Sequence, residues 1–557
     1  MNHKWWKEQV VYQVYPRSFF DANGDGIGDL KGIISKLDYL ILLGIDTLWI
    51  SPHFDSPNED NGYDIRDYKK VMEEFGTMED FDTLLESCHK NSIRLIVDLV
   101  VNHTSDEHDW FVKSRSSKMN DYRDFYIWKK GKGNDLPNNW PAFFGGSAWE
   151  KTKETGEYYL HYFSKKQPDL NWDNPKVRKS VYDLMRFWLD KGIDGFRMDV
   201  IPFISKDKQF LDLSKEELKA PEKTYTKGPN LGAYLKEMNR EVLSKYDIFS
   251  VGEAFGIGRD AMMRMSDERE KELDLVFLFD IVRIGREDWY QKSWTLPQLK
   301  KLFEIQSNTD SNHWPTVFLN NHDNPRSVSN YGNTKDYRVK SAKLLALLTL
   351  TQRGTPFLYQ GEEIGMTNVD FKAIDDFDDL QVRGNLSKVL KNKITKEEYL
   401  NHLNRSSRDH SRTLMQWSDQ RKAGFSKNEN TWFLVNPNYH EINVEKNLND
   451  PKSVFNFYRN LILIRKKSKE LIYADYKDLD PKHPQIFCYQ RLGKKQTYLI
   501  ILNFSSDYVS YKIPVFNSKY RLIISNKLDK ISPVKSNFIE LDPWDALMFK
   551  ISNLYEN

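Results

Sequence analysis

Eight short apolar runs of strand type, spread between residues 10 and 359, constrain the fold more than any other feature of the sequence. They cover residues 10–15, 47–50, 95–101, 195–200, 248–251, 275–279, 316–319 and 356–359. Segments with the periodicity of amphipathic helices separate them. Because strands that alternate with helices form parallel sheets, eight such units predict an α/β fold, a (β/α)8 TIM barrel.

The alternation is interrupted twice and ends before the C-terminus. Residues 104–172, after the third run, are rich in Trp, Gly and Asn and predict a small inserted domain. Residues 367–425, after the eighth run, are charged and partly helical and predict a second insertion. From residue 473 onward, short β-prone runs alternate with turn residues, which predicts a C-terminal antiparallel β-sandwich over 473–557. The barrel is then expected to comprise residues 1–103 and 173–472.

Composition narrows the class of function. The 82 basic and 80 acidic residues give a net charge of +2, which offers no basis for binding nucleic acid or an anionic membrane. We expect no membrane span and no signal peptide, because no sufficiently long apolar run is present. Two cysteines, Cys88 and Cys488, cannot build a disulfide framework. A cytoplasmic monomer that acts on a small substrate is the resulting expectation.

The fourth and fifth strands each end in one carboxylate, Asp199 and Glu253, at the strand ends where barrels of this kind place their chemistry. Cleaving a glycosidic bond with retention needs two carboxyl groups about 5–5.5 Å apart, and neighbouring strands lie about 4.8 Å apart. Arg197 shares a strand face with Asp199 and favours its ionised form, as a nucleophile requires. The apolar neighbours of Glu253 favour a protonated general acid. The alternative is a structural Arg–Asp pair with an unrelated surface Glu.

Four segments, in order and spacing, resemble the conserved regions of the α-amylase superfamily of glycoside hydrolases: 98–103, 195–199, 251–253 and 321–323. The resemblance covers essentially the whole chain. It is strongest to the oligo-1,6-glucosidase branch, through residues 56–64, 163–172, 359–367 and 407–413. It implies a retaining, exo-acting α-glucosidase that hydrolyses short α-glucosides, α-1,6-linked ones such as isomaltose foremost, through a covalent glucosyl-enzyme.

The resemblance also implies roles for individual residues. Asp323 would be the third carboxylate, which stabilises the oxocarbenium-like transition state. Tyr63 would stack on the glucose ring, while Asp60 and Arg408 would pair and close the pocket behind it. Val200 matches the α-1,6-specific glucosidases and would lie near the leaving sugar. The residues expected to bind the substrate are Asp60, Tyr63, His103, Phe163, Gln167, Arg197, Val200, His322 and Arg408.

An oxygen-rich loop near the N-terminus predicts a structural Ca²⁺ site. Its expected ligands are Asp21, Asn23, Asp25, Ile27 and Asp29, with Gly26 for the sharp turn. The pattern departs from an EF-hand loop, since Gly32 stands where a bidentate glutamate would be, and a Gly/Asp-rich turn is the alternative. The loop resembles the calcium loop of oligo-1,6-glucosidases, which favours the metal. No organic cofactor is expected.

Other activities remain open. Sucrose isomerases share the fold and the carboxylates; Arg283 and Arg286 match their Arg-Leu-Asp-Arg-Asp loop, and residues 324–326 also resemble them. However, Gly285 replaces the Asp of that loop, and Val200 replaces the Thr that isomerases carry. A sucrose or α-1,4-glucosidase and a trehalose-6-phosphate hydrolase are further candidates. A non-catalytic, glucosidase-like transporter subunit is disfavoured, because such relatives have a membrane anchor and lack the full set of carboxylates.

Overall fold

The computed structural model describes residues 4–133, 135–287, 289–308, 312–515, 518–527 and 537–553. The outermost residues of the predicted barrel and sandwich, 1–3 and 554–557, lie outside these ranges.

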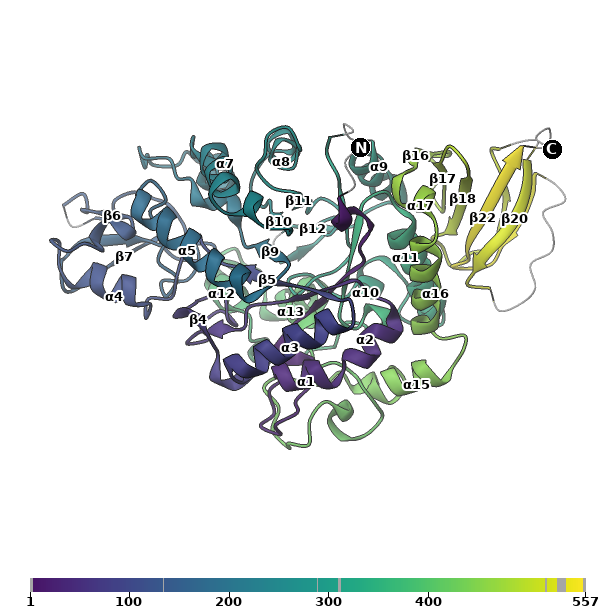
Figure 1. The fold of residues 1–557 in the computed structure, drawn as a ribbon, viewed down its shortest axis with the longest axis horizontal. Coiled ribbons are helices and arrows are strands. Elements are labelled where there is room, and N and C mark those ends of the chain that lie inside the picture. The colour runs from purple at the N-terminus through teal and green to yellow at the C-terminus, as the bar shows by residue number, and fades with distance from the viewer. Residues whose placement is uncertain are drawn as a thin grey trace.

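An eight-stranded parallel sheet forms the centre of the molecule (Figure 1). Hydrogen bonds join its strands in the order β11-β10-β9-β5-β2-β1-β15-β14. The Thr316 hydroxyl donates to the carbonyl oxygen of Val276 over 3.0 Å and links the two outer strands. All eight predicted strands are present, and the sheet is a nearly closed (β/α)8 barrel as predicted. The strands are β1 (Val11–Val14), β2 (Thr47–Ile50), β5 (Arg94–Leu99), β9 (Gly195–Met198), β10 (Phe249–Glu253), β11 (Leu275–Phe277), β14 (Thr316–Val317) and β15 (Thr355–Tyr359).

Helices on the outside of the barrel bury the outer faces of these strands, which is why the strands read as continuous apolar runs. They include α3 (Met78–Lys90), α5 (Pro175–Lys191), α11 (Arg338–Thr351) and α16 (Val454–Lys466). Local sequence sets where helices begin: Thr77 and Asp80 form a capping box at α3, and Asn174 caps α5 ahead of Pro175. Inside the barrel, aromatic rings such as Trp49 and Phe277 stack with centroids 5.7 Å apart.

The C-terminal part is an antiparallel sandwich, as predicted. Strands β16 (Asp475–Asp478), β17 (Ile486–Leu492), β18 (Thr497–Asn503), β22 (Ala546–Asn553) and β20 (Ser518–Ser525) form one sheet in that order. Strand β19 (Val509–Lys512) pairs with β21 (Phe538–Leu541) in a second sheet. Alternating side chains from both sheets, among them Leu499 and Ile539, share one core.

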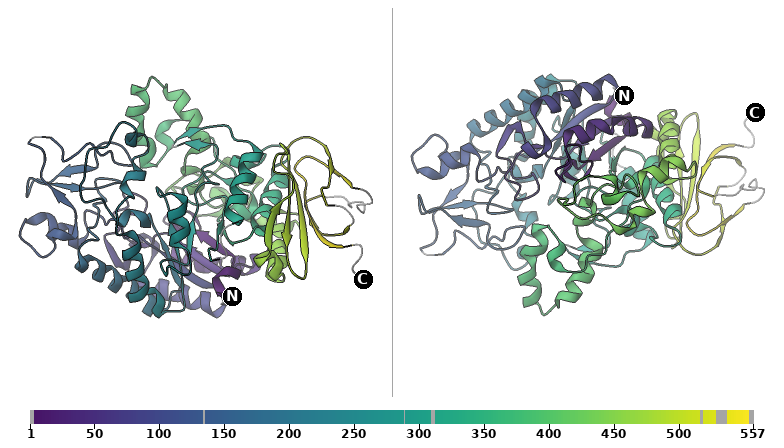
Figure 2. Two further views of the ribbon diagram at one scale, coloured as in Figure 1. Left: turned by 90° about the horizontal axis from the view of Figure 1, so that it is seen from above. Right: turned by 90° about the horizontal axis from the view of Figure 1, so that it is seen from below.

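Two segments interrupt the barrel. The first holds α4 (Asp109–Ser116) and a three-stranded antiparallel sheet of β6 (Trp128–Lys129), β8 (Tyr158–Leu160) and β7 (Trp149–Lys151). The second, after β15, holds α12 (Leu380–Lys391), α13 (Lys396–Ser406) and α14 (Asp409–Arg412). The inserted sheet and the C-terminal sandwich lie at opposite ends of the molecule (Figures 1 and 2). Within the described residues, no helix is long and apolar enough to cross a membrane.

Candidate active site

Asp199 and Glu253 are brought together by the register of two neighbouring strands. Strand β9 pairs with β10 so that Arg197 lies opposite Val251 and Met198 opposite Gly252. The next positions in this register are Asp199 and Glu253. Both carboxylates are more than nine-tenths buried and line one pocket at the carboxyl end of the barrel.

A single guanidinium lies between three carboxylates. Nη1 of Arg197 is 2.5 Å from Oδ1 of Asp98 and 2.7 Å from Oδ1 of Asp199, and its Nη2 is 2.5 Å from Oε2 of Glu253. Trp49 donates its indole N–H to the other oxygen of Asp98 over 2.9 Å. In the sequence, Asp98 is the first residue of the segment 98–103, and its position inside strand β5 gives no sign of this contact.

The protonation of Asp199 differs from the expectation that Arg197 alone keeps it ionised. Burial raises the pKa of Asp199 well above its usual range, Arg197 lowers it, and Glu253 and Asp98 raise it further. Arg197 cannot outweigh burial because its charge is divided among three acids. Two buried carboxyl groups this close favour a state in which the pair retains one proton.

Val200, directly after Asp199, has a backbone conformation that is rare for its residue type. Its φ of 34° and ψ of 41° lie in the left-handed region, which costs a β-branched residue about 1–3 kcal/mol. This conformation directs the Val200 N–H toward Oε2 of Glu253, 3.3 Å away, and the Val200 side chain lines the pocket. The strain is therefore located at the contact between the two carboxylate-bearing segments.

Asp323 is in a different electrostatic environment from Asp199. Its Oδ1 accepts from Arg412 over 3.0 Å and from Arg408 over 3.3 Å, and Nε2 of His322 lies 3.1 Å from its Oδ2. Burial opposes ionisation, but His322, Arg408 and Arg412 together hold the pKa of Asp323 well below its usual range. Asp323 is therefore a permanent negative charge in the pocket.

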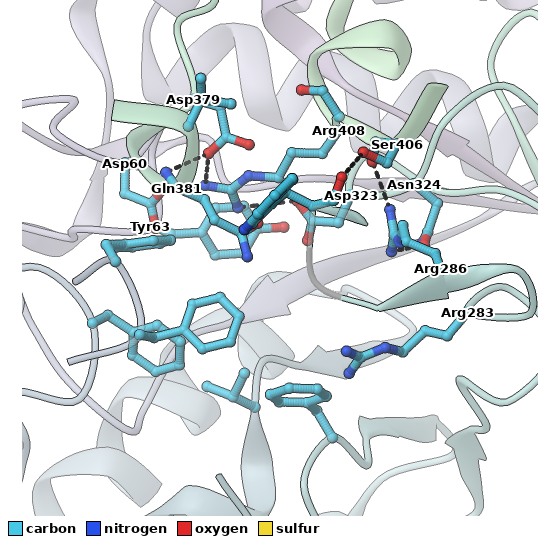
Figure 3. A pocket seen from close by; sticks show the side chains of 18 of the residues that line it. Asp60, Tyr63, Arg283, Arg286, Asp323, Asn324, Asp379, Gln381, Ser406 and Arg408 are labelled. Atoms are coloured by element: carbon cyan, nitrogen blue, oxygen red, sulfur yellow. Dashed lines mark hydrogen bonds and ion pairs between the residues drawn. The ribbon is translucent and has the colours of Figure 1, made fainter. Parts of the chain in front are cut away.

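Arg408 joins three acidic side chains around one end of the pocket (Figure 3). Its Nη2 is 3.4 Å from Oδ1 of Asp60, the partner expected from the sequence, and 2.8 Å from Oδ1 of Asp379. Asp379 is the N-cap of α12 and lines the pocket. It could not be identified from the sequence because it is one of four aspartates in the segment 375–379, which offers no motif.

Three residues expected to contact the sugar lie behind the pocket wall. Gln167 and His322 are fully buried and Arg197 is 1% exposed. The Tyr63 hydroxyl is 2.6 Å from Nε2 of His322, and the two rings stack with centroids 5.3 Å apart. Gln167 donates to Asp60 over 3.1 Å. These three side chains therefore orient residues that line the pocket.

The pocket itself combines acids, aromatic rings and three arginines, Arg283, Arg286 and Arg408. The predicted site residues that line it are Asp60, Tyr63, His103, Phe163, Asp199, Val200, Glu253, Asp323 and Arg408. Further lining residues, not predicted as substrate-binding, are Phe143, Phe144, Phe255, Phe279, Trp289, Asp379 and Tyr399. Aromatic faces of this kind suit the apolar faces of sugar rings.

Arg283 and Arg286 enter the pocket from the loop after β11 (Figure 3). Arg286 donates to Oδ1 of Asn324 over 2.7 Å and to the carbonyl oxygen of Ser406 over 3.0 Å. Arg326, in contrast, is fully buried and donates to backbone carbonyls, for example that of Gln360 over 2.6 Å. Three of the residues that resemble the isomerases therefore line the pocket, namely Arg283, Arg286 and Asn324. Arg326 does not line it.

In the N-terminal loop, the carboxylates accept hydrogen bonds from the loop's own backbone. Asp29 accepts the N–H groups of Ala22 and Asn23 over 2.9 and 3.0 Å, and Asp21 accepts that of Gly24 over 2.6 Å. Within the described residues, no three His, Cys, Asp or Glu side chains converge as metal ligands. A cation in this loop would therefore also need amide and carbonyl oxygens, which Ca²⁺ accepts.

Comparisons with known proteins agree with this geometry. The model for the alpha amylase catalytic domain matches residues 13–474. An oligo-1,6-glucosidase of Parageobacillus thermoglucosidasius is 48% identical over 99% of this chain and 100% of its own. A glucan 1,6-alpha-glucosidase of Streptococcus pneumoniae is 44% identical, with coverage of 99% and 100%. Among solved structures, the isomaltulose synthase of Erwinia rhapontici with sucrose superimposes with a TM-score of 0.97 at 49% identity, covering 99% of this chain and 100% of that one.

Proposed function

The chain belongs to the alpha-amylase family of glycoside hydrolases, and from that premise we propose that it is a retaining, exo-acting α-glucosidase for short α-1,6-linked glucosides. The observation that carries the proposal is the pair Asp199 and Glu253, which neighbouring strands present in one buried pocket.

In the proposed reaction Asp199 attacks the anomeric carbon of the terminal glucose while Glu253 protonates the departing glycosidic oxygen. The carbon–oxygen bond to the leaving sugar breaks as the bond to the Asp199 carboxylate forms. Glu253, now ionised, takes a proton from water, which cleaves the glucosyl-enzyme and restores both groups. The ionised Asp323 would stabilise the positive charge that develops on the ring.

Exo action would follow from the closed end of the pocket. Arg408 and the acids around it, Asp60 and Asp379, occupy the space behind the first glucose. A longer chain cannot pass through this cluster, so glucose units would be released singly. The pocket's lining from both insertions, for example Phe163 and Val382, supports the same interpretation.

The preference for α-1,6 linkages is proposed from Val200 and from the names of the relatives. Val200 lines the pocket and directly follows the proposed nucleophile, so it would lie near the leaving sugar. The oligo-1,6-glucosidase and glucan 1,6-alpha-glucosidase relatives match over almost the whole chain.

Incubation of the purified protein with isomaltose, maltose, sucrose and trehalose-6-phosphate, in separate reactions, tests the proposal. Glucose released fastest from isomaltose is the expected result. A preference for maltose, or rapid internal cleavage of starch, would contradict the assignment.

Sucrose isomerisation is the second candidate, because Arg283 and Arg286, which match the isomerase loop, line the pocket. The structural neighbours that carry this activity, among them the Erwinia rhapontici enzyme, are about as similar as the glucosidases. In the sucrose reaction above, isomaltulose or trehalulose would identify an isomerase, whereas equimolar glucose and fructose would identify a hydrolase.

A structural Ca²⁺ ion in the loop 21–29 is a further part of the proposal. Oδ1 of Asp21 and Oδ1 of Asp29 each accept one backbone N–H and keep a further lone pair, and Asn23, Asp25 and the Ile27 carbonyl lie in the same turn. An ion that binds the folded state alone raises stability. EDTA should lower the Tm, and elemental analysis should find calcium. An unchanged Tm with no bound metal would refute the proposed Ca²⁺ site.

Action in the cytoplasm as a monomer is proposed from the balanced charge and the two buried, unpaired cysteines, Cys88 and Cys488. Size-exclusion chromatography with light scattering and cell fractionation test the two points separately. A dimer or a secreted protein would contradict them.

A further inference from the structure

A contact between two glycine-containing segments, remote in sequence, lies beside the pocket. Gly145 belongs to the turn 142–146 of the first insertion, and Gly384 lies in α12 of the second. A Cβ atom on Gly384 would overlap the carbonyl oxygen of Phe144, and one on Gly145 would lie 2.8 Å from the carbonyl oxygen of Gly384. The two backbones therefore touch with no space for a side chain. We call Phe144, Gly145 and Gly384 the glycine seam.

Glycine at position 384 lowers the stability of α12 relative to alanine, and the close contact with Phe144 accounts for it. In a helix interior alanine is favoured over glycine, so helix propensity alone would select against Gly384. Gly145 has a φ of +94°, which side chains rarely adopt, so its backbone conformation also requires glycine. Both positions line the wider groove into which the pocket opens.

Both sides of the seam continue to the same guanidinium. On one side, the Phe144 ring lies with its centroid 5.3 Å from Cζ of Arg408 and lines the pocket. On the other, Asp379, the N-cap of the helix that carries Gly384, is 2.8 Å from Nη2 of Arg408 (Figure 3). Arg408 in turn contacts Asp60 and Asp323.

We propose that the glycine seam is a positioning contact: by fixing the first insertion against α12, it places Phe144 and Asp379 on Arg408 and so shapes the subsite that holds the terminal glucose. The proposal rests on the function proposed above and assigns a role to residues that do not touch the reacting atoms. Gly384 and Gly145 are positioning residues, so their loss should weaken sugar binding more than it slows bond cleavage.

Gly384→Ala tests the proposal, because its Cβ forces the two segments apart. With isomaltose we expect the KM to rise about tenfold and kcat to stay within about twofold of the wild type, since ground-state and transition-state binding are lost together. The inhibition constant for glucose should rise in parallel. Ser387→Ala is the matched control: it lines the same groove one turn further along α12 and should leave both constants unchanged.

Gly145→Ala is the second variant, in case Gly384→Ala does not fold, and should shift KM in the same direction. The glucose-dependent rise in Tm gives a readout that needs no turnover, and it should be smaller in both variants than in the wild type. Wild-type KM and wild-type glucose binding in a folded variant would overturn the seam's role, as would a loss of kcat at constant KM. A wild-type enzyme that hydrolyses no α-glucoside would contradict the proposed function instead, and the glucose-dependent Tm would still test the seam.

Discussion

One arginine beside the pocket and two at the joint between barrel and sandwich are all deeply buried, but their partners differ. Arg197, Arg465 and Arg491 are each at most 1% exposed. Arg197, behind the pocket wall, bonds three carboxylates, two of which line the pocket. Arg465, in α16, bonds backbone carbonyls of the barrel such as that of Leu350, 2.8 Å away, and Arg491, in β17, bonds that of Ala474 over 2.7 Å.

The charge of the partners decides whether the pKa of each buried arginine is raised or lowered. Burial lowers the pKa of Arg465 and of Arg491, because carbonyl oxygens carry no full charge to offset desolvation. Burial also opposes the charge on Arg197, but Asp98 and Glu253 outweigh it and raise the pKa of Arg197 well above its usual range. At the joint, therefore, the guanidinium groups donate to carbonyl oxygens at helix ends. Beside the pocket, a cation bonds three acids at once and does not offset the rise that burial causes in the pKa of Asp199.

The largest effect should come from removing the acids that Arg197 holds. Asp199→Ala should lower kcat by about 10⁴-fold or more, and Glu253→Gln by about 10²–10⁴-fold, with little change in Tm. Initial rates with isomaltose and calorimetry measure the two quantities. Near-wild-type turnover in either purified variant would refute the roles given to these carboxylates.

Removing an arginine at the joint should lower stability and leave activity unchanged, which is the opposite of the result expected for the two carboxylates. Arg465→Met should lower the free energy of unfolding by about 3–5 kcal/mol, because several buried carbonyls lose their donor at about 1–3 kcal/mol each. kcat and KM should not change at a temperature where the variant is folded. Thermal unfolding and rates at 20 °C below the Tm check this, and lost activity in the folded variant would erase the distinction between the regions.

Val200 tests whether the pocket's shape sets the linkage. Val200→Thr or Val200→Ala should raise the ratio of maltose to isomaltose turnover, by an amount equivalent to about 1–3 kcal/mol, because one or two methyl groups change. Measuring kcat/KM for both disaccharides gives the ratio. An unchanged ratio would place the choice of linkage elsewhere in the pocket.

The smallest expected effect is the change in Tm when a carboxylate of the pocket is replaced by an amide. The pKa of Asp199 is raised in the folded state, so its ionised form destabilises the fold, and stability falls as the pH rises through that value. Asp199→Asn should therefore raise the Tm at pH 7 by about 1–3 °C, and the gain should shrink at pH values below the raised pKa. Asp323→Asn should lower the Tm, because the pKa of Asp323 is depressed and its ionised form stabilises the fold above its unfolded pKa.

The raised pKa of Asp199 should also affect how activity depends on pH. Since the nucleophile must be ionised, kcat/KM should fall with decreasing pH through the raised pKa of Asp199, at pH values where an exposed aspartate is still ionised. A profile that stays flat down to about pH 4 would contradict the effect of burial on this carboxyl.

The barrel could be predicted from the sequence because its signal is local. Each strand is a short apolar run, and Asp199 and Glu253 follow from the strand ends and the order of the chain. The contact of Asp98 with Arg197 and that of Asp379 with Arg408 could not be predicted, because each depends on how segments apart in the sequence pack together. The positive φ of Val200 also has no local signal, since valine is a residue that disfavours it.

The covalent step tests the central claim most directly. The enzyme, treated with 5-fluoro-α-D-glucosyl fluoride so that the glucosyl-enzyme accumulates, would be digested and analysed by mass spectrometry. The account predicts one fluoroglucosyl group on the peptide that contains Asp199, and none in Asp199→Ala. A label on Glu253 or Asp323, or turnover of the reagent with no labelled peptide, would contradict the assignment of Asp199 as nucleophile.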